Sequence, residues 1–173
     1  VDCYGADGDS LASVVGDLLR RSHQTLAVAE SCTGGGLGQL LTAIPGSSDY
    51  FWGGVIAYDN RVKEKVLQVQ PQTLVQAGAV SAATAEQMAI GVKAVLGTDW
   101  GLSITGIAGP TGATEGKPVG LVYVGLAAPD STVMAQAYRL GDRGRDWVRQ
   151  VSACSALDLL RRSLLARVES DRA

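Results

Sequence analysis

The sequence predicts an α/β fold with a mixed sheet of about five strands that helices cover on both faces. The first observation is an order of apolar patterns: helix, strand, helix, strand, helix, helix, strand, strand, strand, helix. The second is a pair of glycine-rich loops, 33–36 and 106–112, each of which follows a short apolar run. Since ligands of open sheets bind beyond the carboxyl ends of strands, the loops are expected to converge if their strands are neighbours.

The first half of the chain predicts three helices and two strands. The first helix begins after Ser10, a good N-cap, carries an apolar stripe and ends at Arg20 and Arg21. The next elements are a buried strand over 26–28, a helix over 37–44, a strand over 51–58 that its paired glycines weaken, and a short charged helix over 60–67. Residues 47–49 are expected to form a loop, and 71–79 a connecting segment.

The second half predicts a helix, three strands and a long last helix. Ser81 is the expected N-cap of a helix that Gly97 closes. The strand over 100–105 runs into the second glycine loop, 119–127 and 133–139 form a hairpin, and an apolar seam over 147–168 forms the last helix. We therefore expect a single domain over 10–168, with a loose lead-in at 1–9 and a tail at 169–173.

The composition argues against several classes of protein. A net charge of −2 and a pI near 5.3 provide no basic face, so nucleic-acid binding is not expected. No apolar run is long enough to cross a membrane. Three widely spaced cysteines are typical of free cytosolic thiols. The single histidine, His23, is expected to lie exposed to solvent at the end of a helix. We expect a cytoplasmic protein without a metal or cofactor. The chain begins at Val1 without a methionine, so the sequence does not establish where the native N-terminus lies.

The stretch from Ala29 to Gly36 (AESCTGGG) reads as a strand end, a glycine turn and a helix start. The first N–H groups of a helix have no internal partners, so such a junction can hold a phosphate or a developing oxyanion, with Ser31 at its mouth. In the alternative interpretation the glycines only permit the turn, and Ser31 and Thr33 are helix caps. The stretch matches neither a Walker loop nor a nucleophile elbow.

Five motifs together resemble one family. They are AESCTGG at 29–35, PGSS at 45–48, Tyr58 with Asn60 and Lys63, GAVS at 78–81, and TGIAGP at 105–110. In this order, over about residues 10–165, they resemble the CinA C-terminal domain family, whose stand-alone members are nicotinamide-nucleotide amidases. The resemblance implies a three-layer α/β/α sandwich. It also implies hydrolysis of the carboxamide of nicotinamide mononucleotide (NMN) to nicotinic acid mononucleotide and ammonia. Larger members carry a further N-terminal domain, for which 173 residues leave no room.

The resemblance, with the needs of amide hydrolysis, assigns roles to single residues. Ser31 is the expected nucleophile, Lys63 its base, and Tyr58 a proton relay between them or a group that holds Ser31. A lysine base must be neutral, so burial or a nearby cation has to lower its pKa. Backbone N–H groups near Thr33 and Gly34 are expected to stabilise the oxyanion. The expected substrate-binding residues are Thr33, Gly34, Gly35, Ser48, Asn60, Thr105, Gly106, Gly109 and Arg145, with Arg145 on the 5′-phosphate.

Two departures from the family's pattern bear on these roles. Asp59 stands where the family often has serine, which places a carboxylate beside Lys63. The arginine motif before the last helix has two extra residues, so either Arg143 or Arg145 is the functional arginine. Arg145 is favoured because it lies four residues before Arg149, the family's spacing between its two arginines.

Several alternatives stay open. Cys32 is a rival nucleophile, although alternation in an extended segment would point it away from Ser31. Glu30 reads as a hydrogen-bonding group that orients the turn. Without the family, Lys63 reads as a solvated surface lysine. The rival class of function is a non-catalytic nucleotide-binding or regulatory module that uses the same glycine loops. Glycine-rich strands and the Phe51–Trp52 pair suggest an interface, so a homo-oligomer is expected.

Overall fold

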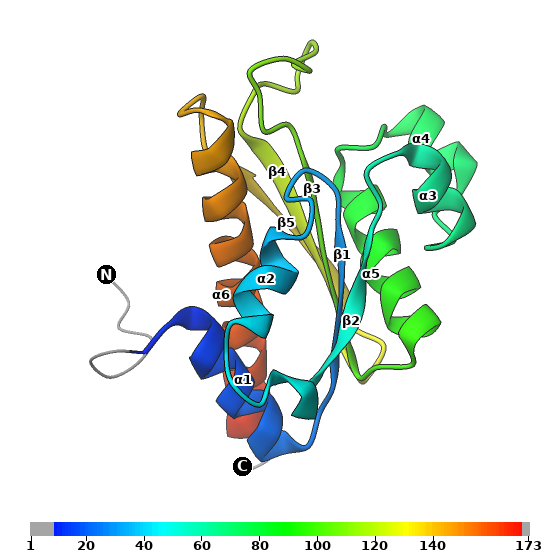
Figure 1. Cartoon of the computed structure of the whole chain (residues 1–173). Coiled ribbons are helices and arrows are strands. Elements are labelled where there is room, and N and C mark those ends of the chain that lie inside the picture. Colours follow the sequence, from blue (N-terminus) through cyan, green and yellow to red (C-terminus); the bar gives the residue numbers. More distant parts are fainter. Residues whose placement is uncertain (1–8, 171–173) are drawn as a thin grey trace.

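A five-stranded sheet forms the centre of the computed structural model, which describes residues 9–170 (Figure 1). The strands are β1 (Leu26–Glu30), β2 (Phe51–Ile56), β3 (Trp100–Gly106), β4 (Leu121–Ala127) and β5 (Val133–Arg139). Their order is β2-β1-β3-β4-β5; β1 runs parallel to β2 and β3, whereas β3, β4 and β5 are antiparallel. The predicted mixed sheet is confirmed. Most of the expected lead-in, with Cys3, lies outside the described residues.

Helices cover both faces of this sheet. One face carries α1 (Leu11–Ser22), α2 (Gly36–Thr42) and α6 (Arg145–Ser170), and the other carries α5 (Ala82–Leu96) with the short α3 (Asn60–Lys65) and α4 (Pro71–Gln76) beside it (Figure 1). The larger apolar core lies on the α1–α2–α6 side, and a smaller one under α5 includes Ala27, Met88 and Val92. The three-layer α/β/α sandwich is therefore confirmed.

Local sequence accounts for the main element boundaries. The Ser10 and Ser81 hydroxyls accept N–H groups of the first turns of α1 and α5, and Gly97 closes α5 with a positive φ of 68°. Gly101 in β3 and Gly125 in β4 allow α5 to pack closely on the sheet. A Cβ at Gly101 or Gly125 would collide with a backbone carbonyl of α5, so the helix lies directly on β3 and β4.

The structure corrects the prediction in three segments. Residues 71–79 are not a plain connection, because α4 occupies Pro71–Gln76: Pro71 suits the first position of a helix, and Leu74 packs on the smaller core. The expected loop at 47–49 is a 3₁₀ turn, η1 (Ser47–Asp49). Helix α6 extends to Ser170, beyond the predicted end at 168. Residues 171–173 lie outside the described chain.

None of the helices over residues 9–170 has the length and apolar content that a membrane span requires.

Candidate functional site

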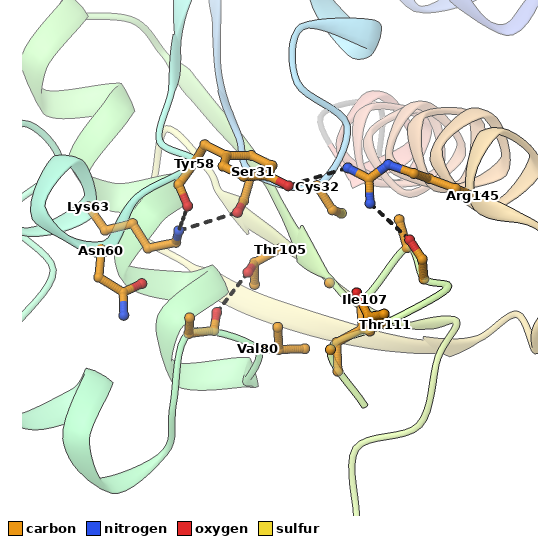
Figure 2. Close-up of a pocket in the computed structure, with 15 residues that line it drawn as sticks. Ser31, Cys32, Tyr58, Asn60, Lys63, Val80, Thr105, Ile107, Thr111 and Arg145 are labelled. Atoms are coloured by element: carbon orange, nitrogen blue, oxygen red, sulfur yellow. Dashed lines mark hydrogen bonds between the residues drawn. The ribbon is translucent and has the colours of Figure 1, made fainter. Parts of the chain in front are cut away.

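A cavity of about 310 Å³ lies beyond the carboxyl ends of β1 and β3 (Figure 2). The two strands are parallel neighbours, and the Ser31 N–H donates to the carbonyl of Ile104 across them at 2.9 Å. The segments that follow β1 and β3 therefore begin at one edge of the sheet, but only the second of the two predicted glycine loops, 106–112, lines the cavity; from the first segment the cavity has Ser31 and Cys32. The cavity is lined by Ser31, Cys32, Tyr58, Asn60, Lys63, Ala79, Val80, Thr105, Gly106, Ile107, Ala108, Gly109, Thr111, Gly112 and Arg145.

The buried end of the cavity holds Ser31 and Lys63. Lys63 Nζ lies 3.2 Å from Ser31 Oγ, 2.6 Å from the carbonyl oxygen of Ala57 and 3.3 Å from that of Tyr58. In its neutral form the amine donates one hydrogen to each carbonyl and keeps its lone pair for the Ser31 hydroxyl hydrogen. The geometry thus matches a serine with a lysine as its base.

The environment of Lys63 favours the neutral amine. Its side chain is only 1% exposed, although the sequence of α3 reads as a solvated charged helix. Burial lowers the pKa of the Lys63 amine, and the Asp59 carboxylate partly opposes this shift. Asp59 is the N-cap of α3 and pairs with Arg61 at 3.0 Å, which with the other Arg61 contact lowers the pKa of Asp59 to about 2. The Asp59 carboxylate is therefore paired with Arg61.

Glu30 occupies the start of α2 that the sequence suggested as an open anion nest. Its buried carboxylate accepts the N–H groups of Gly35, Leu37 and Gly38 at 2.8–3.1 Å. A carboxylate suits these donors because a helix N-terminus carries a partial positive charge. Glu30 is thus the orienting group that the sequence indicated, and the expectation that these N–H groups face a ligand is wrong.

Tyr58 and Arg145 form the open end of the cavity. The phenol is 63% exposed, and the Arg145 Nη2 atom donates to it at 3.3 Å, while Nη1 donates to the carbonyl of Gly109 at 3.0 Å. Figure 2 shows that the Tyr58 hydroxyl points toward Arg145 and that only the Tyr58 carbonyl contacts Lys63. The predicted relay of a proton through the phenol does not fit this arrangement.

Of the two candidate arginines, Arg145 lines the cavity, whereas Arg143 lies over the ring of Trp147, 5.0 Å from its centroid. Arg145 has no carboxylate within 4 Å among the described residues. An unpaired guanidinium at a cavity mouth is suited to an anion.

The remaining wall comes from two segments that distant contacts hold in place. The Thr105 hydroxyl donates to the carbonyl of Ala79 at 2.7 Å, and Lys117 Nζ donates to that of Ala77 at 2.5 Å. These bonds fix the stretch that carries Val80, which with Ile107 and Ala108 gives this side an apolar surface. The sequence motifs covered these apolar positions but gave no signal that they line the cavity.

Four predicted binding residues lie away from this cavity. Thr33 is fully buried, and the Gly34 and Gly35 N–H groups donate to the Ser31 carbonyl and to Glu30. Ser48 lies in η1, just before β2, whereas Ser31 follows β1. Because β1 and β2 are parallel, those two positions are at opposite ends of the sheet. The cavity of this chain therefore contains Asn60, Thr105, Gly106, Gly109 and Arg145 from the predicted set.

Cys32 is not suited to the rival role of nucleophile. The side chain is 5% exposed, and burial raises the pKa of the Cys32 thiol to about 11. The thiolate is the reactive form, and at neutral pH this thiol is protonated.

Comparison with known proteins matches residues 8–164 to the CinA C-terminal domain. A CinA-like protein of Synechococcus sp. is 69% identical over 164 residues, which are 95% of this chain and 39% of that protein. A CinA-like protein of Nostoc punctiforme is 67% identical over 168 residues, 96% of this chain and 40% of that protein. The chain thus spans about two fifths of the length of these curated relatives.

Solved structures resemble the whole fold. The competence/damage inducible protein CihA of Agrobacterium tumefaciens has a TM-score of 0.87 and 36% identity, covering 95% of this chain and 99% of that one. A CinA superfamily protein of Klebsiella pneumoniae has a TM-score of 0.86 and 30% identity, covering 90% and 96%.

Proposed function

Since the chain belongs to the CinA C-terminal domain family, we propose that it is an amidase that hydrolyses the carboxamide of NMN to nicotinic acid mononucleotide and ammonia. The observation that carries the proposal is the buried Lys63 amine 3.2 Å from the Ser31 hydroxyl. A module that only binds a nucleotide has no use for a buried lysine beside a serine, because burying an amine costs stability.

The proposed reaction begins with attack by Ser31. The Ser31 hydroxyl passes its proton to neutral Lys63 as Oγ forms a bond to the carboxamide carbon. The tetrahedral intermediate collapses with cleavage of the C–N bond, and the Lys63 ammonium protonates the leaving nitrogen, so ammonia departs. Water then attacks the ester and gives a proton to Lys63. The C–Oγ bond breaks, and Lys63 returns the proton to Ser31.

The developing oxyanion requires a backbone donor near the buried end. The Gly34 N–H is engaged with the Ser31 carbonyl at 3.2 Å. The Cys32 N–H, in the residue that follows Ser31 and lines the cavity, is the proposed donor.

The open end supports recognition of a mononucleotide. The Arg145 guanidinium, which has no carboxylate partner among residues 9–170, is the proposed partner of the 5′-phosphate, and Val80 and Ile107 provide an apolar wall for the pyridine ring. The volume of about 310 Å³ is at the small end of ligand pockets, roughly 300–1,000 Å³, which favours a mononucleotide over a dinucleotide.

The test is ammonia release by the purified protein, with NMN and free nicotinamide side by side. We expect release from NMN, much less from nicotinamide, and a loss of at least about a thousandfold in Ser31→Ala. Tight binding of NMN without ammonia release would instead support the binding module.

A further inference from the structure

The turn that carries Ser31 is held from two sides. On the inside, Glu30 binds the N–H groups at the start of α2. On the outside, the Arg149 Nη2 atom donates to the Thr33 carbonyl at 2.9 Å, a contact between residues 116 positions apart. Thr33 itself is fully buried, and its hydroxyl has no hydrogen-bond partner within the described chain. The Thr33 side chain therefore adds no polar restraint, and the outer side of the turn depends on Arg149.

Arg149 also connects this turn to the mouth of the cavity. It lies one helical turn after Arg145 in α6, so both guanidinium groups project from the same side of the helix. Arg145 contacts Gly109 and Tyr58 at the cavity, while Arg149 contacts the backbone two residues beyond Ser31. The first two turns of α6 thus touch both the open end of the cavity and the support of the nucleophile.

We propose that Arg149 is a positioning residue that fixes the Ser31 hydroxyl between Lys63 and the bound carboxamide. The inference rests on the proposed role of Ser31 as nucleophile. Arg149 does not line the cavity, so its loss is expected to act on the chemical step and to leave binding nearly unchanged. A misplacement of about 1 Å in such a group costs on the order of 100-fold in rate.

The surroundings of Arg149 offer a chemical rescue. A second cavity of about 420 Å³ lies between α2 and α6 and is lined in part by Thr33, Asp146, Arg149 and Gln150. Truncation in Arg149→Ala enlarges this space beside the Asp146 carboxylate, which lies 3.5 Å from Arg149 Nη1. Free guanidinium can enter there and donate to the Thr33 carbonyl. Gln150→Ala is the matched control, because Gln150 lines the same cavity, is exposed and, within the described chain, has no side-chain hydrogen bond to the turn.

The first experiment measures kcat and KM for NMN in Arg149→Met, Arg149→Lys and Gln150→Ala. We expect Arg149→Met to lower kcat about 10- to 100-fold with KM within about threefold. The kcat of Arg149→Lys, which keeps a donor, is expected to fall between those of Arg149→Met and the unchanged protein.

The rescue is measured in Arg149→Ala, with the same assay. Guanidinium chloride at about 20 mM, far below denaturing concentrations, is expected to raise kcat of Arg149→Ala and to leave kcat of Gln150→Ala unchanged. A rise in KM with kcat unchanged would assign Arg149 to binding and overturn the inference.

The second experiment does not depend on the substrate. Phenylmethylsulfonyl fluoride sulfonylates an activated serine with loss of fluoride, and intact mass follows the rate, with Ser31→Ala as the blank. We expect this rate to fall in Arg149→Met and to recover with guanidinium in Arg149→Ala. If Ser31 is labelled but NMN is not hydrolysed, the proposed substrate fails while the labelling rates still decide the role of Arg149. Equal labelling of the unchanged protein and folded Arg149→Met, without rescue of Arg149→Ala, would overturn that role.

Discussion

The two ends of the cavity differ more in their contact with water than in their polarity. At the buried end, Ser31 is 9% and Lys63 1% exposed, and their contacts are backbone carbonyls and each other. At the open end, Tyr58 is 63% exposed, and Arg145 has no carboxylate within 4 Å in the part of the chain that the structure describes. Proton transfer requires a perturbed amine, which burial provides, whereas capture of an anion requires a permanent cation that solvent can reach. In the proposed function, chemistry therefore belongs to the buried end and recognition to the open end.

The largest expected effect is at the buried end. Lys63→Met and Lys63→Arg are both expected to lose at least about a thousandfold in kcat, because methionine has no basic atom and arginine stays protonated. The melting temperature of Lys63→Met is expected to be equal to or above that of the unchanged protein, since the substitution removes a buried amine. Steady-state ammonia release and thermal unfolding measure the two effects. An active Lys63→Arg would contradict a neutral-amine base.

The pH dependence sharpens the same assignment. Because burial lowers the pKa of Lys63, kcat is expected to rise about tenfold per pH unit below that pKa and to level off above it. Between the lowered pKa and the ordinary lysine pKa, the unfolded chain binds more protons than the folded one. Stability relative to Lys63→Met therefore increases with pH over that window. Denaturant unfolding of both proteins at several pH values checks the sign, and a decrease with rising pH would contradict it.

A smaller effect is expected at the open end. Arg145→Ala is expected to raise KM for NMN about 10- to 100-fold with a lesser change in kcat, which corresponds to a charged hydrogen bond of roughly 1.5–3 kcal/mol. Arg143→Ala is the matched control, because Arg143 stacks on Trp147 outside the cavity. KM of the unchanged protein should also rise with ionic strength. Equal effects of the two substitutions would remove the phosphate role of Arg145.

The smallest effect concerns the phenol. Tyr58→Phe is expected to keep kcat within about threefold, since the hydroxyl contacts Arg145 and only the backbone of Tyr58 contacts Lys63. A proton relay through the phenol predicts a loss of about 100-fold or more. The same ammonia assay at the pH plateau separates these outcomes.

Local patterns were sufficient for most of the fold. Serine caps, apolar periodicity and glycine stops located the long helices and the five strands, and these signals depend on neighbouring residues alone. Helix α4 was missed although Pro71 is a helix-start signal, because a six-residue helix has too short an apolar pattern.

The site was less predictable, since its properties depend on contacts between distant segments. Lys63 is on a charged helix, and its burial follows from where Ala57 and Ser31 lie in the fold. Only the family resemblance singled it out. The direction of the Tyr58 phenol depends on Arg145, 87 residues away, and the occupied start of α2 depends on how the Glu30 side chain folds back. No local spacing encodes the direction of the phenol, whereas Glu30 contacts N–H groups only five to eight residues further along the chain, and the sequence did indicate its orienting role.

The central claim is that burial lowers the pKa of the Lys63 amine, which lies against the Ser31 hydroxyl. The most direct measurement is an NMR titration of the chain with ¹³C at lysine Cε, in which Lys63→Met identifies the Lys63 signal among the four lysines and the exposed Lys65 is an internal reference. We predict a midpoint for Lys63 clearly below that of Lys65. Titration of both at the same ordinary lysine pKa would contradict the account.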